Sequence, residues 1–445
     1  MRVNGMQETA RAIAQRLRTA GHVAYFAGGC VRDMESGIAP KDYDIATDAT
    51  PGEVQALFSR TYAVGAAFGV VVVVENGMNF EVAAFRSDDA YIDGRRPRAV
   101  HFSSPEEDAQ RRDFTINGMF FDPARDEVLD YVGGRADLHA RVIRAIGDAA
   151  QRFAEDRLRL LRAVRFATVL GFEIETATWQ ALVANAASIT QISAERIRDE
   201  LVKIFASPQR LRGWDLLDRS GLLRAILPEI ERMKGCEQPP QFHPEGDVFN
   251  HTRIMLEMLP SAASLPLVWS VILHDVAKPV TATTDETGRI RFNGHDRIGA
   301  EMTEAIMTRL RFSRVEIDAT VEMVRQHMVF KDVPKMRTAK LKRFIARPTF
   351  NDELELHRVD CASSHAMLDN YEFLLRKRDE FAHEPMIAPP LVRGDDLKLL
   401  GLSPGPQFGE ILSEVETRQL EGTLRTREEA LEWVKKEYAE ERGKR

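Results

Sequence analysis

The sequence predicts a multidomain protein in which a mixed α/β head is followed by helical domains. The chain has 445 residues, which is more than one hydrophobic core usually supports. In the first third, the stretch FGVVVVVENGMNFEVAAFR contains two β-rich runs joined by Asn76-Gly77, a strong signal for a β-hairpin. From about residue 140 the apolar residues recur at helical spacing, as in QRFAEDRLRLLRAVRFATVLGF. We therefore expect the head to end near residue 140 and the remainder to be mostly helical.

Three other segments of the head have a clear local pattern. VAYFA, residues 23–27, is predicted to be a short strand, and KDYDIAT, residues 41–47, a second strand. A helix is expected to begin after Thr50, because Thr50 can cap it, Pro51 fits its first position and Glu53 stands three residues after the cap.

The bulk composition is typical of a globular protein, with 44% hydrophobic and 29% charged residues. No run of 18 apolar residues occurs, so no membrane-spanning helix is expected. Residues 1–22 have the pattern of an amphipathic helix rather than a secretion signal. The three cysteines lack CxxC spacing, which argues against a disulfide framework or a thiolate zinc site and suits the reducing cytoplasm.

The charge of the chain is uneven along its length. A net charge of −7 does not by itself indicate a nucleic-acid-binding protein. However, seven arginines lie between Arg141 and Arg165. A local basic strip can bind phosphates within an acidic protein, because salt screens electric fields beyond about 10 Å.

Two aspartates in the second predicted strand are the first candidate for a chemical site. Side chains alternate along a strand, so Asp42 and Asp44 should point the same way and repel each other. A bound Mg²⁺ would remove this conflict, because Mg²⁺ is commonly held by one or two carboxylates together with substrate phosphates. The alternative is an exposed strand with two solvated acids.

The surroundings of these aspartates favour the metal site. Gly28-Gly29 lies just before them, and a glycine turn lets backbone N–H groups approach a phosphate. Glu81 lies among apolar neighbours in the hairpin, where a carboxylate needs a partner. Two interpretations of Glu81 stay open: it completes the metal site, or it pairs with an arginine.

Four ordered motifs give the chain a family resemblance. AGGCVRD, KDYDIAT, RRDFTINGM and EDRLRLLRAVRFA resemble the motifs of class II tRNA nucleotidyltransferases, or CCA-adding enzymes, and of the related bacterial poly(A) polymerases. The likeness covers residues 23 to about 230, and it implies a head of the polymerase β type. It also implies that Asp42 and Asp44 are catalytic and bind Mg²⁺. The residues implied in nucleotide binding are Gly28, Gly29, Arg32, Arg111, Arg112, Asp113, Asn117, Glu155, Asp156 and Arg159.

The EDRLR segment is the part expected to select the base. If the segment is one helix, Asp156 and Arg159 are at i and i+3 on one face, and Glu155 is one turn from Arg159. The resemblance implies that Asp156 and Arg159 bind the base edge of CTP or ATP while Glu155 orients the arginine, and that Asp113 lies near the ribose. The alternative is a surface ion pair, worth about 0–1 kcal/mol.

The resemblance implies addition of CCA to the 3′ end of tRNA from CTP and ATP, with release of pyrophosphate. The alternatives are a poly(A) polymerase, or an enzyme that adds only CC or only A. Ala66-Ala67, in YAVGAAFGVVVV, stands where poly(A) polymerases have basic residues and Phe, which favours the CCA type. Residues 87–100 resemble the loop proposed to help the switch from C to A addition.

The helical part contains histidines in the pattern of an HD domain. His251, His274, Asp275 and Asp360 match the core pattern, and His295 and His327 match extra positions of variable use. Together they suit a second divalent metal. The alternative is a degenerate HD fold kept as a body domain. A different class of function follows if this site dominates: a metal phosphohydrolase whose head serves as an RNA clamp. A binding-only protein, with both sites as relics, is a further alternative.

The chain is expected to have four parts. Its cysteine content leads us to expect it in the cytoplasm. The helical neck and body should hold the tRNA acceptor arm, and packing is the first interpretation of the proline- and glycine-containing tail. The predicted parts are the head at 1–140, the neck and body at 141–235, the HD domain at 236–375 and the tail at 376–445.

Overall fold

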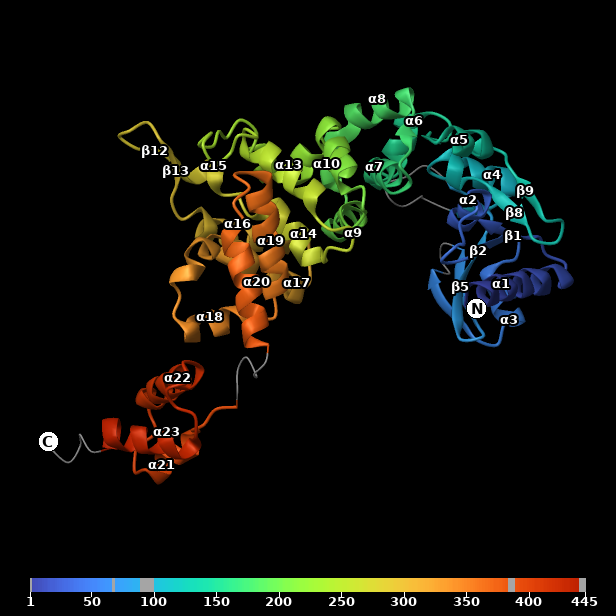
Figure 1. Ribbon diagram of the computed structural model, residues 1–445. Helices are drawn as coiled ribbons and strands as arrows, with labels where there is room; N and C mark the ends of the chain where they lie inside the picture. The colour runs from blue at the N-terminus through green and yellow to red at the C-terminus, as the bar shows by residue number, and fades with distance from the viewer. Residues whose placement is uncertain (1, 66–68, 89–99, 383–388, 440–445) are drawn as a thin grey trace. The chain divides into compact units, whose positions relative to one another are not determined.

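The computed structural model describes residues 2–65, 69–88, 100–382 and 389–439 (Figure 1). The chain divides into two compact units. The first holds the residues up to Glu231 together with Arg309–Phe312, and the second holds the rest. An α/β head followed by mostly helical structure confirms the predicted fold class. The four part boundaries expected from the sequence stay predictions.

A seven-stranded sheet forms the head, in the order β3-β4-β5-β2-β1-β8-β9. β2 and β5 are parallel, and the other neighbours are antiparallel. The strands of the sheet are β1 (Ala24–Ala27), β2 (Asp44–Thr47), β3 (Thr61–Gly65), β4 (Val70–Glu75), β5 (Met78–Ala84), β8 (Phe120–Asp122) and β9 (Glu127–Leu129). Two short pairs lie outside it: β6 (Arg86–Asp88) with β7 (Val100–Phe102), and β10 (Val142–Ile143) with β11 (Glu173–Ile174).

Helices cover the sheet and continue beyond it within the first unit. α1 lies against β1 and β2 and beside α3, which packs on β4 and β5 (Figure 1). The helices of this unit are α1 (Arg2–Thr19), α2 (Gly29–Glu35), α3 (Pro51–Leu57), α4 (Pro105–Gln110), η2 (Thr115–Asn117), α5 (Gly134–Ala140), α6 (Ala149–Glu155), α7 (Leu158–Leu170), α8 (Thr176–Asn185), η3 (Ala186–Gln191), α9 (Ala194–Phe205), α10 (Arg210–Arg219), α11 (Leu222–Ile226) and α12 (Pro228–Glu231).

Two local predictions are confirmed in detail. The β4–β5 hairpin turns at Asn76 and Gly77, which both have positive φ, at 52° and 73°. Such a turn matches the right-handed twist of its strands. At α3, the Thr50 side chain accepts a hydrogen bond from the Glu53 N–H, and the Glu53 carboxylate accepts one from the Thr50 N–H, with Pro51 at the start of the helix.

The second predicted strand is shorter than expected. β2 begins at Asp44, so Asp42 lies in the segment before it, and the strand argument for a shared face was wrong for this residue. The cause is the partner strand. Asp44 pairs with Ala27, the last residue of β1, and the chain then turns at Gly28 with φ 73°. Residues before Asp44 therefore have no strand beside them on this edge.

In its described residues, the second unit has helices and one hairpin, β12 (Ala282–Thr284) with β13 (Ile290–Phe292). α13, α14, α17 and α19 pack on one another and bury Trp269 and Met323 completely. The helices of this unit are α13 (Val248–Met258), α14 (Leu265–Leu273), α15 (Lys278–Thr281), α16 (His295–Arg309), α17 (Arg314–Gln326), η4 (His327–Lys335), α18 (Thr338–Ile345), α19 (Phe350–Ser363), α20 (Asp369–Phe381), α21 (Gly394–Leu399), α22 (Pro406–Leu420), α23 (Arg427–Val434) and η5 (Lys435–Ala439).

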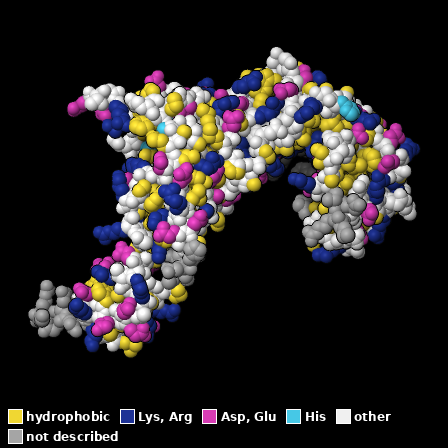
Figure 2. All heavy atoms as spheres, viewed as in Figure 1, with side chains coloured by type: hydrophobic (Ala, Val, Ile, Leu, Met, Phe, Trp, Pro, Cys, Tyr) yellow, Lys and Arg dark blue, Asp and Glu magenta, His cyan; other side chains and the backbone are white. Residues whose placement is uncertain are grey.

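The tail helices α21, α22 and α23 bury a small core of their own around Leu397, Ile411 and Val434. Charged residues of both signs are interspersed over the face of the molecule in Figure 2. Among the described residues, no helix has the length and apolar character needed to cross a membrane.

Candidate active site

A cavity of about 600 Å³ in the first unit gathers the predicted nucleotide site. Its lining includes both aspartates and every residue implied in nucleotide binding except Glu155. It also holds eight arginines against four aspartates, a formal excess of four positive charges. A pocket of this charge suits a triphosphate. The lining residues that were predicted are Gly28, Gly29, Arg32, Asp42, Asp44, Arg111, Arg112, Asp113, Asn117, Asp156 and Arg159.

The turn after β1 forms one wall of the cavity. Gly28 has φ 73° and ψ −127°, a conformation that residues with a Cβ rarely adopt. A Cβ on Gly28 would lie 3.2 Å from Nη1 of Arg112. The glycine therefore permits both the turn and the close approach of a guanidinium.

Three carboxylates lie together beside this turn. Burial, Glu81 and Asp42 raise the pKa of Asp44 to about 6, against a smaller effect of Arg112. β2 and β5 pair Ile45 with Val82, which places Glu81 next to Asp44. Both interpretations of Glu81, completion of the metal site and pairing with an arginine, stay predictions. The carboxylate oxygens of Asp42, Asp44 and Glu81 do not all lie within 4.8 Å of one another. Neighbouring carboxylates that repel one another are nevertheless the type of ligand that Mg²⁺ prefers.

The RRD segment follows α4, and its charged side chains are held firmly. Arg111 and Arg112 both pair with the buried Asp108. Arg32 donates from Nη1 to Oδ1 of Asn117 at 2.9 Å. Arginines fixed in this way present a preorganised set of donors to an anion.

Asp113 has its hydrogen-bonding capacity filled by protein groups. It accepts from the Phe114 N–H, the Asn117 amide and the guanidinium of Arg162. Burial would raise the pKa of Asp113, but Arg162 and Asn117 hold it at about 2. To reach a ribose hydroxyl, this carboxylate would have to release one of those partners.

The EDRLR segment is not one helix, which corrects the predicted geometry. α6 ends at Glu155, Asp156 is extended with φ −136° and ψ 104°, and α7 begins at Leu158. The cause is the Asp156 side chain, whose Oδ1 accepts from the Leu158 N–H at 3.0 Å and so caps the following turn. Asp156 pairs with Arg196 of α9, at 2.9 Å between Oδ2 and Nη2, and not with Arg159.

Arg159 is oriented as the sequence suggested, and by more groups. Its Nη1 donates to Oε2 of Glu155 at 2.7 Å and to the Arg152 carbonyl at 3.0 Å. Its Nη2 donates to the Arg111 carbonyl at 2.8 Å. The Arg159 side chain is buried and lines the cavity. A guanidinium has five N–H groups, and two of those of Arg159 have no partner among the described residues.

The lining also contains residues that the sequence did not single out for the site. The guanidinium carbons of Arg32, Arg162 and Arg165 lie 5.5, 5.2 and 3.9 Å from the centre of the Phe166 ring. Arg162 and Phe166 follow Arg159 by three and seven residues, so the helical period of α7 was the signal that could have found them. Arg162 and Arg165 were already part of the basic strip that can bind phosphates, and the other lining residues not named as candidates are Arg86, Leu158 and Arg196.

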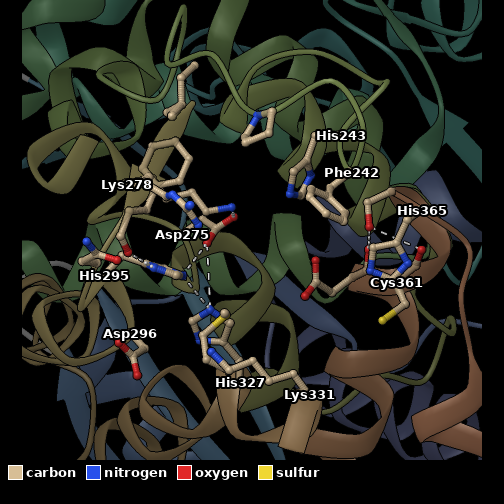
Figure 3. A pocket seen from close by; sticks show the side chains of 18 of the residues that line it. Phe242, His243, Asp275, Lys278, His295, Asp296, His327, Lys331, Cys361 and His365 are labelled. Carbon is tan, nitrogen blue, oxygen red and sulfur yellow. Dashed lines mark hydrogen bonds and ion pairs between the residues drawn. The ribbon is translucent and has the colours of Figure 1, made fainter. Parts of the chain in front are cut away.

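The predicted histidine site lies in the second unit and forms two adjacent groups. His251, His274 and Asp360 have ligand atoms within 4.8 Å of one another. Asp275 belongs instead with His295 and His327, toward which it points in Figure 3. His274 and Asp275 follow the end of α14 rather than lying on it. The four predicted ligands therefore divide between two groups.

Three of these imidazoles are fixed through one ring nitrogen. Nδ1 lies 2.9 Å from the Val271 carbonyl in His274, 2.7 Å from the Phe292 carbonyl in His295 and 2.6 Å from the Val324 carbonyl in His327. Such a bond makes Nδ1 the donor and leaves an Nε2 lone pair facing inward, the arrangement typical of metal ligands.

Protonation differs between the two groups. Burial, with His274 and His295 beside it, lowers the pKa of His327 to about 4, so its ring is neutral. In His251, burial has the opposite effect to the hydrogen bonds of Asp360 and Glu245, which raise the pKa to about 9. A cation bound by His251 would therefore displace a proton. The adjoining cavity of about 590 Å³ is also lined by Lys278 and Lys331.

Some sequence-based predictions fall on residues outside the described part of the chain. Ala66-Ala67 lies there, and so does most of the 87–100 segment, of which β6 and β7 are the described ends.

Family models match three regions of the chain. The Poly A polymerase head domain matches residues 24–144, the probable RNA and SrmB-binding site of polymerase A matches residues 171–234, and the HD domain matches residues 247–361.

One relative and one solved structure extend this likeness over more than nine tenths of the chain. An A-adding tRNA nucleotidyltransferase from Deinococcus radiodurans is 34% identical over 94% of this chain and 96% of its own length. A CCA-adding enzyme from Geobacillus stearothermophilus is 45% identical, over 50% of this chain and 55% of its own length. The crystal structure of the Bacillus stearothermophilus CCA-adding enzyme with CTP superposes with a TM-score of 0.75 at 26% identity, covering 98% of both chains.

Proposed function

Because the chain belongs to the class II tRNA nucleotidyltransferase family and carries an HD domain, we propose that it adds CCA to the 3′ end of tRNA from CTP and ATP. The terminal 3′-hydroxyl attacks the α-phosphate, a phosphodiester bond forms, and pyrophosphate leaves. The observation that carries this proposal is the single cavity in which the carboxylates of the β1–β2 edge, the RRD arginines and the Arg159 donors meet.

The carboxylates are the proposed catalytic groups. Asp42 and Asp44, with Glu81 beside them, would hold Mg²⁺, which supplies charge neutralisation for the triphosphate and a lowered pKa for the attacking hydroxyl. Arg32, Arg111 and Arg112 would bind the triphosphate.

The base would be read by Asp156 and Arg159. Arg159 lines the cavity and has two N–H groups without a partner among the described residues, and Asp156 offers acceptor oxygens. Cytosine and adenine both present a ring-nitrogen acceptor next to an exocyclic amine, so they complement this pair. Uracil and guanine present a carbonyl and a ring N–H there and would leave groups unpaired, which is costly in a buried site.

The remaining parts of the proposal concern the helical domains and the setting. The neck and body over residues 141–235 would hold the tRNA acceptor arm, supported by the RNA-binding family match over residues 171–234. The reaction would take place in the cytoplasm, and all three cysteines are free thiols, as suits that compartment.

The test is to incubate the protein with tRNA that lacks its 3′ end and with CTP, ATP or both, and to sequence the product ends. CCA addition predicts C-C-A from the mixture and only C additions from CTP alone. Single A addition, and only to tRNA that already ends in CC, would instead agree with the activity that names the Deinococcus relative. Long A tracts, or no addition at all, would refute the proposal.

A second candidate activity is metal-dependent phosphoester hydrolysis in the HD domain. The observation that favours it is Nε2 of His274, which is buried, lies 3.1 Å from Oδ2 of Asp275 and has no hydrogen bond of suitable geometry among the described residues. His251, His274 and Asp360 would hold one divalent cation, and Asp275, His295 and His327 would hold another. Bound there, such a cation would lower the pKa of a water molecule and so supply a nucleophile.

The test of this activity compares the protein with its His274→Ala variant. Bound metal is counted by elemental analysis, and hydrolysis of a phosphomonoester and of a cyclic phosphate is measured with added metals. Loss of metal and of hydrolysis in the variant supports the activity. If the wild-type protein binds no divalent metal, the activity is refuted and the HD fold serves only as a structural body domain.

A further inference from the structure

Asp108 is a buried acid next to the nucleotide cavity that the proposed reaction does not use directly. It lies on α4 and is 1% exposed. Its carboxylate is divided between two arginines. Oδ1 accepts from Nε and Nη2 of Arg111 at 2.9 and 2.6 Å. Oδ2 accepts from Nε and Nη2 of Arg112 at 3.1 and 3.0 Å.

The local sequence explains how one carboxylate can hold two guanidiniums. Arg111 and Arg112 follow Asp108 by three and four residues, so the end of one helical turn brings both over the same acid. Each arginine donates to the Asp108 carboxylate through the same edge of its guanidinium, Nε and Nη2. Two parallel hydrogen bonds of this kind fix the plane of the guanidinium as well as its position. Two adjacent positive groups repel, and the acid between them offsets that repulsion while leaving a net positive charge.

The fixed arginines reach three other parts of the cavity. Nη1 of Arg112 donates to the Asn117 carbonyl at 3.3 Å and lies over Gly28. The Arg111 carbonyl accepts from Arg159, which connects the pair to the proposed base reader. Both arginines line the cavity, whereas Asp108 does not.

Asp108 also ties α4 to the start of β6. The Arg86 N–H donates to Oδ1 of Asp108 at 3.3 Å, and Nε of Arg111 donates to the Arg86 carbonyl at 3.1 Å. These two hydrogen bonds hold the backbone of Arg86 against Asp108 and Arg111. The Asp108 carboxylate is therefore fixed by a backbone N–H as well as by the two guanidiniums.

We propose that Asp108 is the positioning residue for the triphosphate: it sets the spacing and orientation of Arg111 and Arg112, through which it acts on every nucleoside triphosphate alike. This inference rests on the proposed nucleotidyl transfer. Asp108 therefore affects the affinity for nucleotide and for pyrophosphate, and it does not contact the reacting atoms.

The test is Asp108→Asn, which keeps the size of the side chain but replaces one acceptor oxygen with a donor that faces a guanidinium. The KM for CTP and for ATP should rise together by roughly 10- to 100-fold, with kcat changed by less than about fivefold. The inhibition constant of pyrophosphate should rise by the same factor, and the KM for tRNA should stay unchanged. A merely structural role would lower thermal stability and the active fraction without moving the pyrophosphate constant.

Three further variants keep the test decisive if Asp108→Asn folds poorly. Asp108→Glu retains both oxygens and should recover at least part of the lost affinity. Glu107→Gln is the matched control, because Glu107 is exposed on the same helix and the substitution makes the same change in charge. In the Asp108→Asn, Arg112→Ala double variant the loss should be smaller than the sum of the single losses, because the two residues act as one unit.

The outcomes separate this inference from the function on which it rests. A wild-type protein that adds no nucleotide to tRNA refutes the proposed function. A wild-type protein that does add them, with an Asp108→Asn variant whose pyrophosphate constant matches that of Glu107→Gln, overturns the role of Asp108. Additive losses in the double variant would overturn it as well.

Discussion

Replacing Arg159 with alanine should weaken base selection more than it slows the chemistry. The arginine uses three of its five N–H groups on Glu155, Arg152 and Arg111, and two remain for the base. The substitution removes those two donors without touching the carboxylates proposed to bind Mg²⁺. Glu155 keeps a partner, since its Oε2 also accepts from Arg152 at 2.9 Å, so no unpaired acid is left behind.

The size of the effect follows from the two donors. A bidentate arginine contact is worth about 1–3 kcal/mol of discrimination against the wrong base. At 1.4 kcal/mol for each factor of ten, selectivity should fall by roughly 5- to 150-fold. We expect kcat with the correct nucleotide to fall by less than selectivity does.

The assay measures kcat/KM for each of the four nucleoside triphosphates on tRNA that lacks CCA and on tRNA that ends in CC. The ratio of C to U on the first RNA, and of A to G on the second, reports selectivity. Arg157→Ala is the matched control, because Arg157 precedes the same helix and does not line the cavity. If both ratios in Arg159→Ala equal those of Arg157→Ala within twofold, Arg159 does not read the base.

Three other changes test the remaining parts of the site. Asp42→Ala should lower nucleotide addition by roughly 10³-fold or more, about 4 kcal/mol, because it removes a proposed metal ligand; circular dichroism should be unchanged, and retained addition would refute the assignment. Asp113→Asn should lower the free energy of unfolding in urea by about 2 kcal/mol at neutral pH, since the depressed pKa of Asp113 stabilises the fold above the ordinary carboxyl pKa and that contribution is lost only as the pH falls through about 2. An unchanged urea midpoint would contradict it. His274→Ala should leave nucleotide addition within twofold of wild type, and a larger loss would mean that the HD domain takes part in the transfer.

Features set by neighbouring residues were predictable from the sequence. The turn at Asn76-Gly77 and the cap formed by Thr50 and Glu53 depend on the local chain alone, and the structure contains both. The start of β2 was not predictable in this way. It depends on where β1 ends, and that is decided by the positive φ of Gly28, on the other side of the pairing.

The break at Asp156 shows a second limit of sequence reasoning. No proline or glycine marks it, and the apolar spacing continues across it. The helix ends because the Asp156 carboxylate bonds to the following backbone and to Arg196, which is 40 residues away in the chain. A partner at that distance has no signature in the local pattern. The contact between Glu155 and Arg159 could be predicted from their spacing, but the pairing of Asp156 with Arg196 could not.

The residues proposed to recognise the base, Asp156 and Arg159, accept both cytosine and adenine. The order in which C and A are added must therefore be decided by another group. Asp156 and Arg159 complement cytosine and adenine equally well, so the pair alone cannot make C precede A. The group that changes between successive additions is the 3′ end of the RNA. We therefore expect Arg159→Ala to lose selectivity by a similar factor on RNA lacking CCA, ending in C, and ending in CC. A loss confined to one of these ends would mean that the pair itself changes between additions, and the order would then be set within the cavity.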